Sequence, residues 1–248
     1  MGITYYGLCA GLGIIAAIMV GEFLIKYFSL SKDAFLLLLA YGGGGGLLGA
    51  KIFYLFVNIQ RINWQGMSLD YFRILMQGGF VFYGGVFGGI VAAVLGGKIH
   101  QIKILPYMEA VAPCLFLGHA IGRVGCYLEG CCYGIPYNGP ACVTYIKSAA
   151  APTGIPLFPV QLLEAVMELI LFLGLFWLVI KKGLRVENLI FYGLGYSILR
   201  FITEFFRYDE ERGMLGIFSI SQWISLICAV GFIFLLGQRM LKKCIFNK

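Results

Sequence analysis

The stretch GHAIGRVGCYLEGCCYG, residues 118–134, places a histidine, an arginine and three cysteines within and just after an apolar run of the chain. A second stretch, RFITEFFR at 200–207, puts two arginines and a glutamate at the end of another apolar run. A charge in the hydrocarbon of a bilayer costs roughly 3 kcal/mol on insertion scales. If these runs cross a membrane, charges kept at that cost indicate a functional site.

The composition is that of an integral membrane protein. Of 248 residues, 60% are hydrophobic and 12% are charged, and the mean hydropathy is +0.87. Such a chain has too little polar surface to cover a soluble globule. A spanning helix needs about 20 apolar residues, so we predict an all-α polytopic membrane protein, one domain over 1–248, with about seven transmembrane helices near 4–25, 34–57, 79–97, 104–122, 157–180, 187–206 and 214–237.

The basic residues predict the orientation. They gather at 26–32, 98–103, 181–185 and 239–248, and basic connections stay in the cytoplasm. The amino terminus is then outside, the carboxyl terminus is cytoplasmic, and residues 123–156 form a small extracytoplasmic cap between the fourth and fifth spans. The first span lacks a basic n-region, so we expect it to stay uncleaved. The net charge of +7 reflects topology, and nucleic acid is not expected as a partner.

Glycine is concentrated in the second and third spans. Eleven glycines lie at 42–46, 49, 79, 84–85 and 88–89. Glycine permits close helix approach, or a broken helix that lines a cavity where backbone groups meet a lipid headgroup. The two interpretations are compatible.

The ionisable residues of the apolar runs predict an anion site. Arg200, Glu204 and Arg207 follow at i, i+4 and i+7, on one face of a helix, with the glutamate between the two arginines. Lys51 and Arg123 could converge on the same cavity, and the planar guanidinium fork suits phosphate. The alternative is a set of structural salt bridges between helices.

His119 lies one helical turn before Arg123 and could act as a general base, because imidazole titrates near neutrality. It could equally be a hydrogen-bonded residue inside the bundle. Glu164 and Glu168 form an i, i+4 pair of like charges. We therefore expect Glu164 to have a cationic partner and Glu168 to be neutral.

Cysteines gather near the expected cap, with the spacing C-x4-CC-x9-C. They could form disulfides, remain reactive thiols or bind zinc. The spacing lacks the paired C-x2-C knuckles of common zinc sites, so no metal and no cofactor are predicted. The residues are Cys126, Cys131, Cys132 and Cys142.

Five ordered motifs resemble the prolipoprotein diacylglyceryl transferases. The resemblance begins at TYYG, residues 4–7, and continues in order to the last span. The five motifs are FYGGVFGG at 82–89, GRVGCYLEGCCYG at 122–134, FPVQLLEAVMEL at 158–169, RFITEFFR at 200–207 and SISQWISL at 219–226.

The resemblance implies an enzyme of the bacterial cytoplasmic membrane. It would transfer the diacylglyceryl group of phosphatidylglycerol to the thiol of a lipobox cysteine in a prolipoprotein and release glycerol phosphate. Arg123 and Arg200 would bind the phosphate, and Glu204 would orient Arg200. Substrate contacts would come from Tyr6, Lys51, Tyr54, Gly84, Gly85, Gln161, Glu164 and Arg207.

The chain departs from the family pattern where the family handles protons. The family's HGGL motif begins here with Tyr83, so the histidine that commonly serves as base is replaced by a phenol, a poor base at neutral pH. Cys126 and Cys131 replace an asparagine and an acidic residue, and Phe158 replaces a histidine. His119 or Glu129 could take over the proton.

Three functional interpretations follow. The first is a prolipoprotein transferase with rearranged proton transfer. The second is a transferase of the same fold that delivers a phospholipid-derived group to another extracytoplasmic acceptor. The third is a non-catalytic protein that binds or transports phospholipid. The partners common to all three are phosphatidylglycerol or other membrane lipid.

Overall fold

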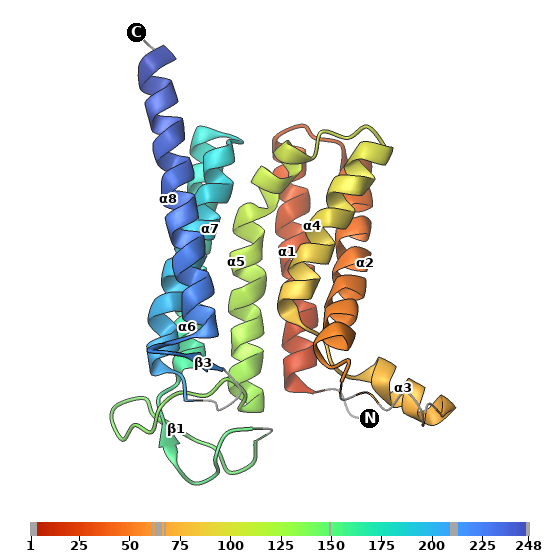
Figure 1. The fold of residues 1–248 in the computed structure, drawn as a ribbon. Coiled ribbons are helices and arrows are strands. Elements are labelled where there is room, and N and C mark those ends of the chain that lie inside the picture. The colour runs from red at the N-terminus through yellow and green to blue at the C-terminus, as the bar shows by residue number, and fades with distance from the viewer. Residues whose placement is uncertain are drawn as a thin grey trace. The chain divides into compact units, whose positions relative to one another are not determined.

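A computed structural model describes residues 4–60, 62, 66, 68–148, 150–208 and 213–246, with the side chains of 77, 82 and 243–246 left out (Figure 1). The described chain is built mainly of helices, with a longer segment, the cap, between α5 and α6. The helices are α1 (Tyr5–Tyr27), α2 (Lys32–Val57), α3 (Leu69–Gln77), α4 (Phe82–Ile99), α5 (Ile104–Glu129), α6 (Val160–Lys182), α7 (Val186–Thr203), the 3-10 helix η1 (Glu204–Phe206) and α8 (Ile220–Phe246). Two short antiparallel pairs complete it, β1 (Val143–Thr144) with β2 (Pro156–Leu157) and β3 (Met214–Leu215) with β4 (Phe218–Ser219).

Each of the seven predicted spans overlaps a helix, which confirms the all-α polytopic architecture. Within the described residues, six helices are long and apolar enough to cross a membrane, and Tyr83–Ile99 is a shorter apolar helix. The bounds of two spans were wrong. The last helix, α8, covers Ile220–Phe246 instead of 214–237, because β3 and β4 lie between Met214 and Ser219. In addition, α5 continues to Glu129 instead of ending near residue 122. Arg123 and Cys126 therefore lie inside α5, and the cap begins at Gly130.

The chain divides into two compact units. One comprises Ile25–Tyr107, and the other comprises Met1–Leu24 together with Met108–Lys248. The single domain expected over 1–248 stays a prediction. Each unit is described separately below.

Glycines bring α2 and α4 into close contact in the unit Ile25–Tyr107 (Figure 1). A Cβ on Gly49 would lie 2.4 Å from the carbonyl oxygen of Gly84, and a Cβ on Gly88 would lie 2.5 Å from that of Gly45. Gly44, on another side of α2, has no atom within 4 Å of such a Cβ. The packing interpretation of the glycine-rich spans is therefore confirmed, because a side chain at Gly49 or Gly88 would collide with the backbone of the facing helix.

The other unit packs α1, α5, α6, α7 and α8. A Cβ on Gly13 of α1 would lie 2.8 Å from the carbonyl oxygen of Gly118, so α1 approaches α5 closely. Phe116 of α5 and Leu175 of α6 are buried together, with Tyr192 of α7 packed against them. This core holds α5, α6 and α7 side by side, farther from the cap than the residues that form the site.

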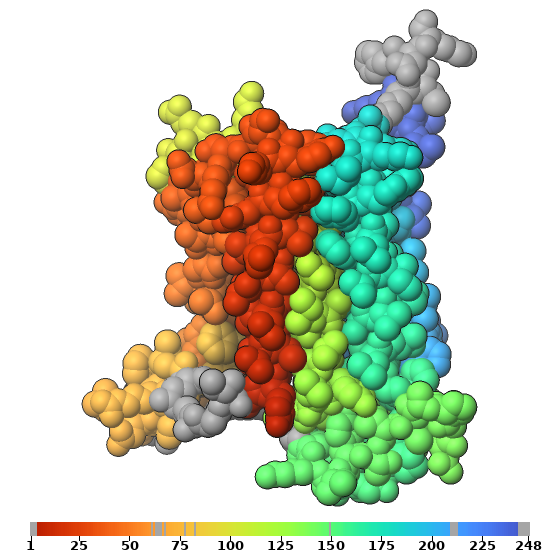
Figure 2. Space-filling view, turned by 180° about the vertical axis from the view of Figure 1, so that it is seen from behind, coloured from red at the N-terminus to blue at the C-terminus, as the bar shows by residue number. Residues whose placement is uncertain are grey.

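The cap is a compact segment between α5 and α6, and Figure 2 shows it in green at the end of these helices. Tyr145, Ala151 and Leu157 form its buried core. The cap is joined to the end of α7 by backbone hydrogen bonds, from Ile135 N–H to the Phe206 carbonyl at 3.0 Å and from Tyr208 N–H to the Tyr133 carbonyl at 3.0 Å. These bonds fix Arg207 beside the cap.

Candidate functional site

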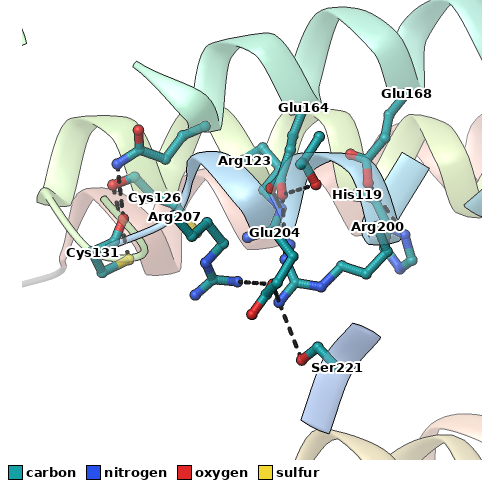
Figure 3. Close-up of polar contacts among 12 residues, drawn as sticks. His119, Arg123, Cys126, Cys131, Glu164, Glu168, Arg200, Glu204, Arg207 and Ser221 are labelled. Carbon is teal, nitrogen blue, oxygen red and sulfur yellow. Dashed lines mark hydrogen bonds and ion pairs between the residues drawn. The ribbon is translucent and has the colours of Figure 1, made fainter. Parts of the chain in front are cut away.

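A buried carboxylate, that of Glu164 on α6, joins three helices (Figure 3). Its Oε2 lies 2.7 Å from Nε of Arg123 on α5, and its Oε1 lies 3.3 Å from a terminal nitrogen of Arg200 on α7. The hydroxyl of Thr203 donates to the same Oε1 at 2.7 Å. The expected cationic partner of Glu164 is thus confirmed, and there are two of them.

A second buried carboxylate, that of Glu204, lies between Arg200 and Arg207. Its Oε2 is 2.7 Å from Nη2 of Arg200 and 3.9 Å from Nη1 of Arg207. Ser221 of α8 lies 3.4 Å from the same Nη2. The predicted arrangement of a glutamate between two arginines is confirmed, although the backbone tightens into η1 at Glu204, so the chain reaches Arg207 by 3-10 geometry rather than along a continuous α-helix.

The arrangement can bind an anion. Among the described residues, three guanidinium groups meet two carboxylates in this network, which leaves one formal positive charge. Arg123 contacts Glu164 through Nε, and its two terminal nitrogens donate no hydrogen bond to any residue that the structure describes. Such nitrogens can donate in parallel to a phosphate. They lie at a narrow hollow lined by Arg123, Glu164, Glu168, Tyr196, Leu199, Arg200 and Thr203.

His119 lies beside this network. Its Nδ1 is 3.9 Å from Oε1 of Glu168, and its ring centroid is 5.3 Å from that of Tyr196. The imidazole is 30% exposed, whereas the Glu168 side chain is 3% exposed. His119 therefore packs between α6 and α7, one turn from Arg123, and its role as a base stays a prediction.

Three of the four predicted cysteines converge where α5 ends. The Sγ atoms of Cys126, Cys131 and Cys132 all lie within 4.8 Å of one another, whereas Cys142 is exposed and does not join them. The chain turns back at Gly130, with φ of 74°, and Cys132 has a φ of 53°, which L residues seldom adopt. All four are free cysteines, so among the described residues the disulfide alternative has no bonded pair.

The thiols are not equivalent electrostatically. Hydrogen bonds from the Cys126 and Cys131 thiols lower the pKa of Cys132, and the positive charges of Arg207 and Arg123 lower it further. The pKa of Cys131 is raised, by its hydrogen bonds with Cys126 and Cys132 and by burial. Cys132 is therefore the thiol of the three that deprotonates most readily, and Arg207 and Arg123 of the arginine network favour its thiolate.

Gln161 and Tyr6 lie next to the cysteine segment. Gln161 is buried in the first turn of α6, and its Nε2 donates to the Cys131 carbonyl at 2.9 Å. The backbone N–H of Tyr6 donates to Glu129 Oε2 at 3.4 Å, and its half-exposed phenol lies within electrostatic reach of Arg123. Gln161 thus holds the backbone of Cys131 in place, and the Tyr6 ring stays accessible from outside the protein.

Lys51 and Tyr54 belong to the unit Ile25–Tyr107. Lys51 is buried, and its Nζ donates to the carbonyl of Leu75 in the last turn of α3 and to those of Gly78 and Gly79 in the turn that follows. Nζ also lies 5.0 Å from the centroid of the Tyr54 ring, against which Gly79 packs. Both residues fasten this turn, and the expected convergence of Lys51 with Arg123 stays a prediction.

Tyr83, Gly84 and Gly85 lie in the first turn of α4. The Tyr83 side chain is 46% exposed. A Cβ on Gly84 would lie 2.4 Å from that of Phe53, and one on Gly85 would lie 3.4 Å from that of Ala50. Packing against α2 therefore accounts for Gly84, and substrate contact by either glycine stays a prediction.

Sequence reasoning missed three residues of the arginine network. Thr203 donates to Glu164, Ser221 contacts Arg200, and Tyr196 lines the hollow. Thr203 and Ser221 lie inside the motifs RFITEFFR and SISQWISL, so the motifs contained the signal. Their roles were hidden because neither hydroxyl carries a charge that an apolar span would have to explain.

Comparison with known proteins gives one consistent family. The family model described as prolipoprotein diacylglyceryl transferase matches residues 1–237. The phosphatidylglycerol–prolipoprotein diacylglyceryl transferase of Clostridium tetani is 34% identical over 242 residues, which cover 96% of this chain and 94% of that protein. The enzyme named as transferase 2 of Clostridium perfringens is 33% identical over 199 residues, covering 79% and 75%. That of Oceanobacillus iheyensis is 28% identical over 247 residues, covering 96% and 85%.

Proposed function

Since the chain belongs to the prolipoprotein diacylglyceryl transferase family, we propose that it joins the diacylglyceryl group of phosphatidylglycerol to a cysteine thiol of a prolipoprotein. The thiol sulfur attacks the glyceryl carbon, the bond from that carbon to the phosphate oxygen breaks, and glycerol phosphate leaves with the bonding electrons. The proton of the thiol passes to a base. The observation that carries the proposal is the buried pair Arg123 and Arg200 on the shared carboxylate of Glu164.

The leaving phosphate gains negative charge in this reaction, and preorganised cations stabilise charge that develops in a transition state. Arg123 is assigned to the phosphate because its two terminal nitrogens are available to it. Arg200 is held by Glu164, Glu204 and Ser221, so its guanidinium is oriented before substrate arrives. Arg207 adds positive charge next to Glu204.

The remaining residues are assigned to orienting the arginines and to binding the donor lipid. Glu164 and Glu204 orient the arginines, and Gln161 positions the segment after α5. Tyr6 would donate its hydroxyl to the phosphatidylglycerol headgroup, since its ring is half-exposed near Arg123. Lys51, Tyr54, Gly84 and Gly85 would contact the donor lipid as well.

His119 is the proposed base, because it is the imidazole one helical turn from the phosphate-binding arginine and faces Glu168 at 3.9 Å. The second candidate is Tyr83, whose exposed phenol stands where the resemblance to the family's HGGL motif implies a histidine. A phenol is a weak base at neutral pH, which favours His119.

The proposed location is the bacterial cytoplasmic membrane, with the amino terminus outside and the carboxyl terminus in the cytoplasm. The multi-pass membrane character rests on the apolar helices. The orientation is supported by the basic residues between and after the spans. The cap and the arginine network would then lie on the extracytoplasmic side, where a secreted prolipoprotein presents its cysteine.

The test is a reconstitution. The protein is purified into nanodiscs containing phosphatidylglycerol and incubated with a lipobox peptide, and both glycerol phosphate release and peptide mass are followed. The expected result is release of glycerol phosphate together with a peptide heavier by one diacylglyceryl group. The control peptide has serine in place of the cysteine and should gain nothing. Glycerol phosphate release with no gain on either peptide would favour another acceptor, and no release would contradict the proposed transfer.

A further inference from the structure

The three cysteines at the end of α5 have the separation that a single metal ion requires. Their Sγ atoms lie within 4.8 Å of one another. Thiolates bind zinc at about 2.3 Å in tetrahedral geometry, which sets their sulfurs about 3.8 Å apart. Small side-chain rotations therefore bring Cys126, Cys131 and Cys132 onto one ion.

The backbone holds these sulfurs in place before any ion binds. Cys126 lies in the last turn of α5, and its carbonyl accepts from the N–H of Cys131 at 3.1 Å. Buried Gln161 fixes the Cys131 carbonyl from α6. Cys132 keeps a left-handed φ of 53°, a conformation that costs energy in an L residue and persists where the surrounding structure holds it. A segment held from two helices suits a metal site better than an unconstrained loop would.

The positive charges near the three cysteines also suit a zinc ion bound by three thiolates. Three thiolates and one divalent cation carry a net charge of −1, which a membrane protein must offset. Arg207 and Arg123 act electrostatically on the Cys132 sulfur, and both come from the arginine network described above. The site therefore has its counter-charge within the same unit.

The cluster offers three sulfur ligands, and the number of protein ligands distinguishes structural from catalytic zinc sites. Structural zinc sites are closed by four protein ligands, whereas catalytic sites keep three and leave the fourth position open. Cys142, the next cysteine along the chain, is exposed and does not join the three. An open fourth position next to a phosphate-binding arginine would be available to a substrate sulfur.

We propose that Cys126, Cys131 and Cys132 bind a zinc ion as thiolates and that its fourth position takes the acceptor thiol. The second part rests on the proposed function. On coordination the acceptor S–H loses its proton to the base, and the zinc-bound sulfur forms the bond to the glyceryl carbon while the electrons of the broken C–O bond stay on phosphate. The ion is neither oxidised nor reduced. Coordination deprotonates a thiol, so a chain with tyrosine at position 83 needs no strong base.

The first experiment measures metal content. The full chain is expressed with zinc supplied, purified without chelator, and analysed by plasma mass spectrometry. About one zinc per chain is expected, and Cys126→Ser, Cys131→Ser and Cys132→Ser should each lose most of it, whereas the matched control Cys142→Ser should keep it. Zinc below about a tenth of an equivalent in the unaltered chain, or a full equivalent in all three variants, would overturn the site.

A second measurement does not depend on variants that could misfold. The unaltered chain is alkylated before and after chelation, and the modified cysteines are identified by peptide mass. Zinc should protect these three thiols and leave Cys142 reactive, and removal of the ion should expose them. A disulfide between any two of the three in the purified protein, or equal alkylation with and without zinc, would overturn the proposal.

The role of the open position is tested with cobalt. Chain loaded with Co²⁺ is mixed with the lipobox peptide or with its serine counterpart, and the thiolate-to-cobalt absorption is recorded. An increase with the cysteine peptide alone supports capture of the acceptor thiol, and no increase overturns it. Glycerol phosphate release is assayed separately. Transfer by a chain without zinc would refute the role of the ion in the reaction and leave the transferase function intact, whereas zinc binding without transfer would support the site and contradict the function.

Discussion

Arg123 and Glu164 bind one another through Nε and Oε2 at 2.7 Å, so the guanidinium meets its carboxylate with one edge and keeps its two terminal nitrogens available. A fork-to-fork pair would have used those nitrogens on the protein itself. The same carboxylate uses its other oxygen for Arg200 and Thr203. A single glutamate therefore orients two arginines and leaves one of them ready for an anion.

Replacing Arg123 by lysine should lower the rate of glycerol phosphate release. Lysine keeps the charge but loses the planar fork, and removal of one donor that stabilises transition-state charge costs about a factor of 100 to 1,000. The measurement is kcat/KM for phosphatidylglycerol in nanodiscs. Arg73→Lys is the matched control, because Arg73 is exposed and pairs only with exposed Asp70 among the described residues. A full rate in Arg123→Lys would count against the phosphate assignment.

Replacing Glu164 by glutamine should destabilise the helical core. The change leaves two largely buried guanidinium groups without their shared carboxylate, and breaking a buried pair by removing one partner costs about 3–5 kcal/mol. The melting temperature in detergent reports it. Glu168→Gln, one turn along the same helix, is the control, because its recorded ion-pair partner among the described residues is His119. Equal melting temperatures for the two variants would show that Glu164 is not the centre of the network.

Replacing Lys51 by methionine should loosen the turn after α3. The ammonium group donates to the carbonyl of Leu75 at the end of α3 and to those of Gly78 and Gly79 in the turn, and a hydrogen bond to a charged group contributes about 1.5–3 kcal/mol. Hydrogen exchange of the peptides covering 69–80 should accelerate, while those of α5 and α7 stay unchanged. The control Lys98→Met, at an exposed position of α4, should leave the hydrogen exchange of all these peptides unchanged. If exchange is unaltered but the KM for phosphatidylglycerol rises, Lys51 acts on the donor rather than on the turn.

Replacing Gly49 by alanine should separate α2 from α4. The new Cβ would meet the Gly84 carbonyl at 2.4 Å, and overpacking of this kind costs about 1–3 kcal/mol. Gly44→Ala is a matched control on the same helix, since its Cβ would meet open space. We expect a lower melting temperature for the first variant and an unchanged or higher one for the second. Identical behaviour would mean that the glycine interface tolerates a methyl group.

The sequence determined the membrane architecture, because a span of about 20 apolar residues is a local property of the chain. The spacing of Arg200, Glu204 and Arg207 likewise predicted one carboxylate between two arginines, since neighbours on a helix need no tertiary information. Hydropathy ended the fourth span too early at residue 122. It counts Arg123 as a charge in lipid, whereas in the fold Glu164 neutralises that charge and α5 continues to Glu129.

Only the tertiary structure brought Glu164 of α6 to Arg123 of α5 and Arg200 of α7, because these contacts join residues far apart in the sequence. The cysteine spacing predicted no metal, since it lacks the usual paired motif. The convergence of Cys126 with Cys131 and Cys132 depends on the reversal at Gly130 and on the left-handed backbone of Cys132. Such a conformation is held by surrounding packing and hydrogen bonds, so the spacing of the cysteines along the chain could not reveal it.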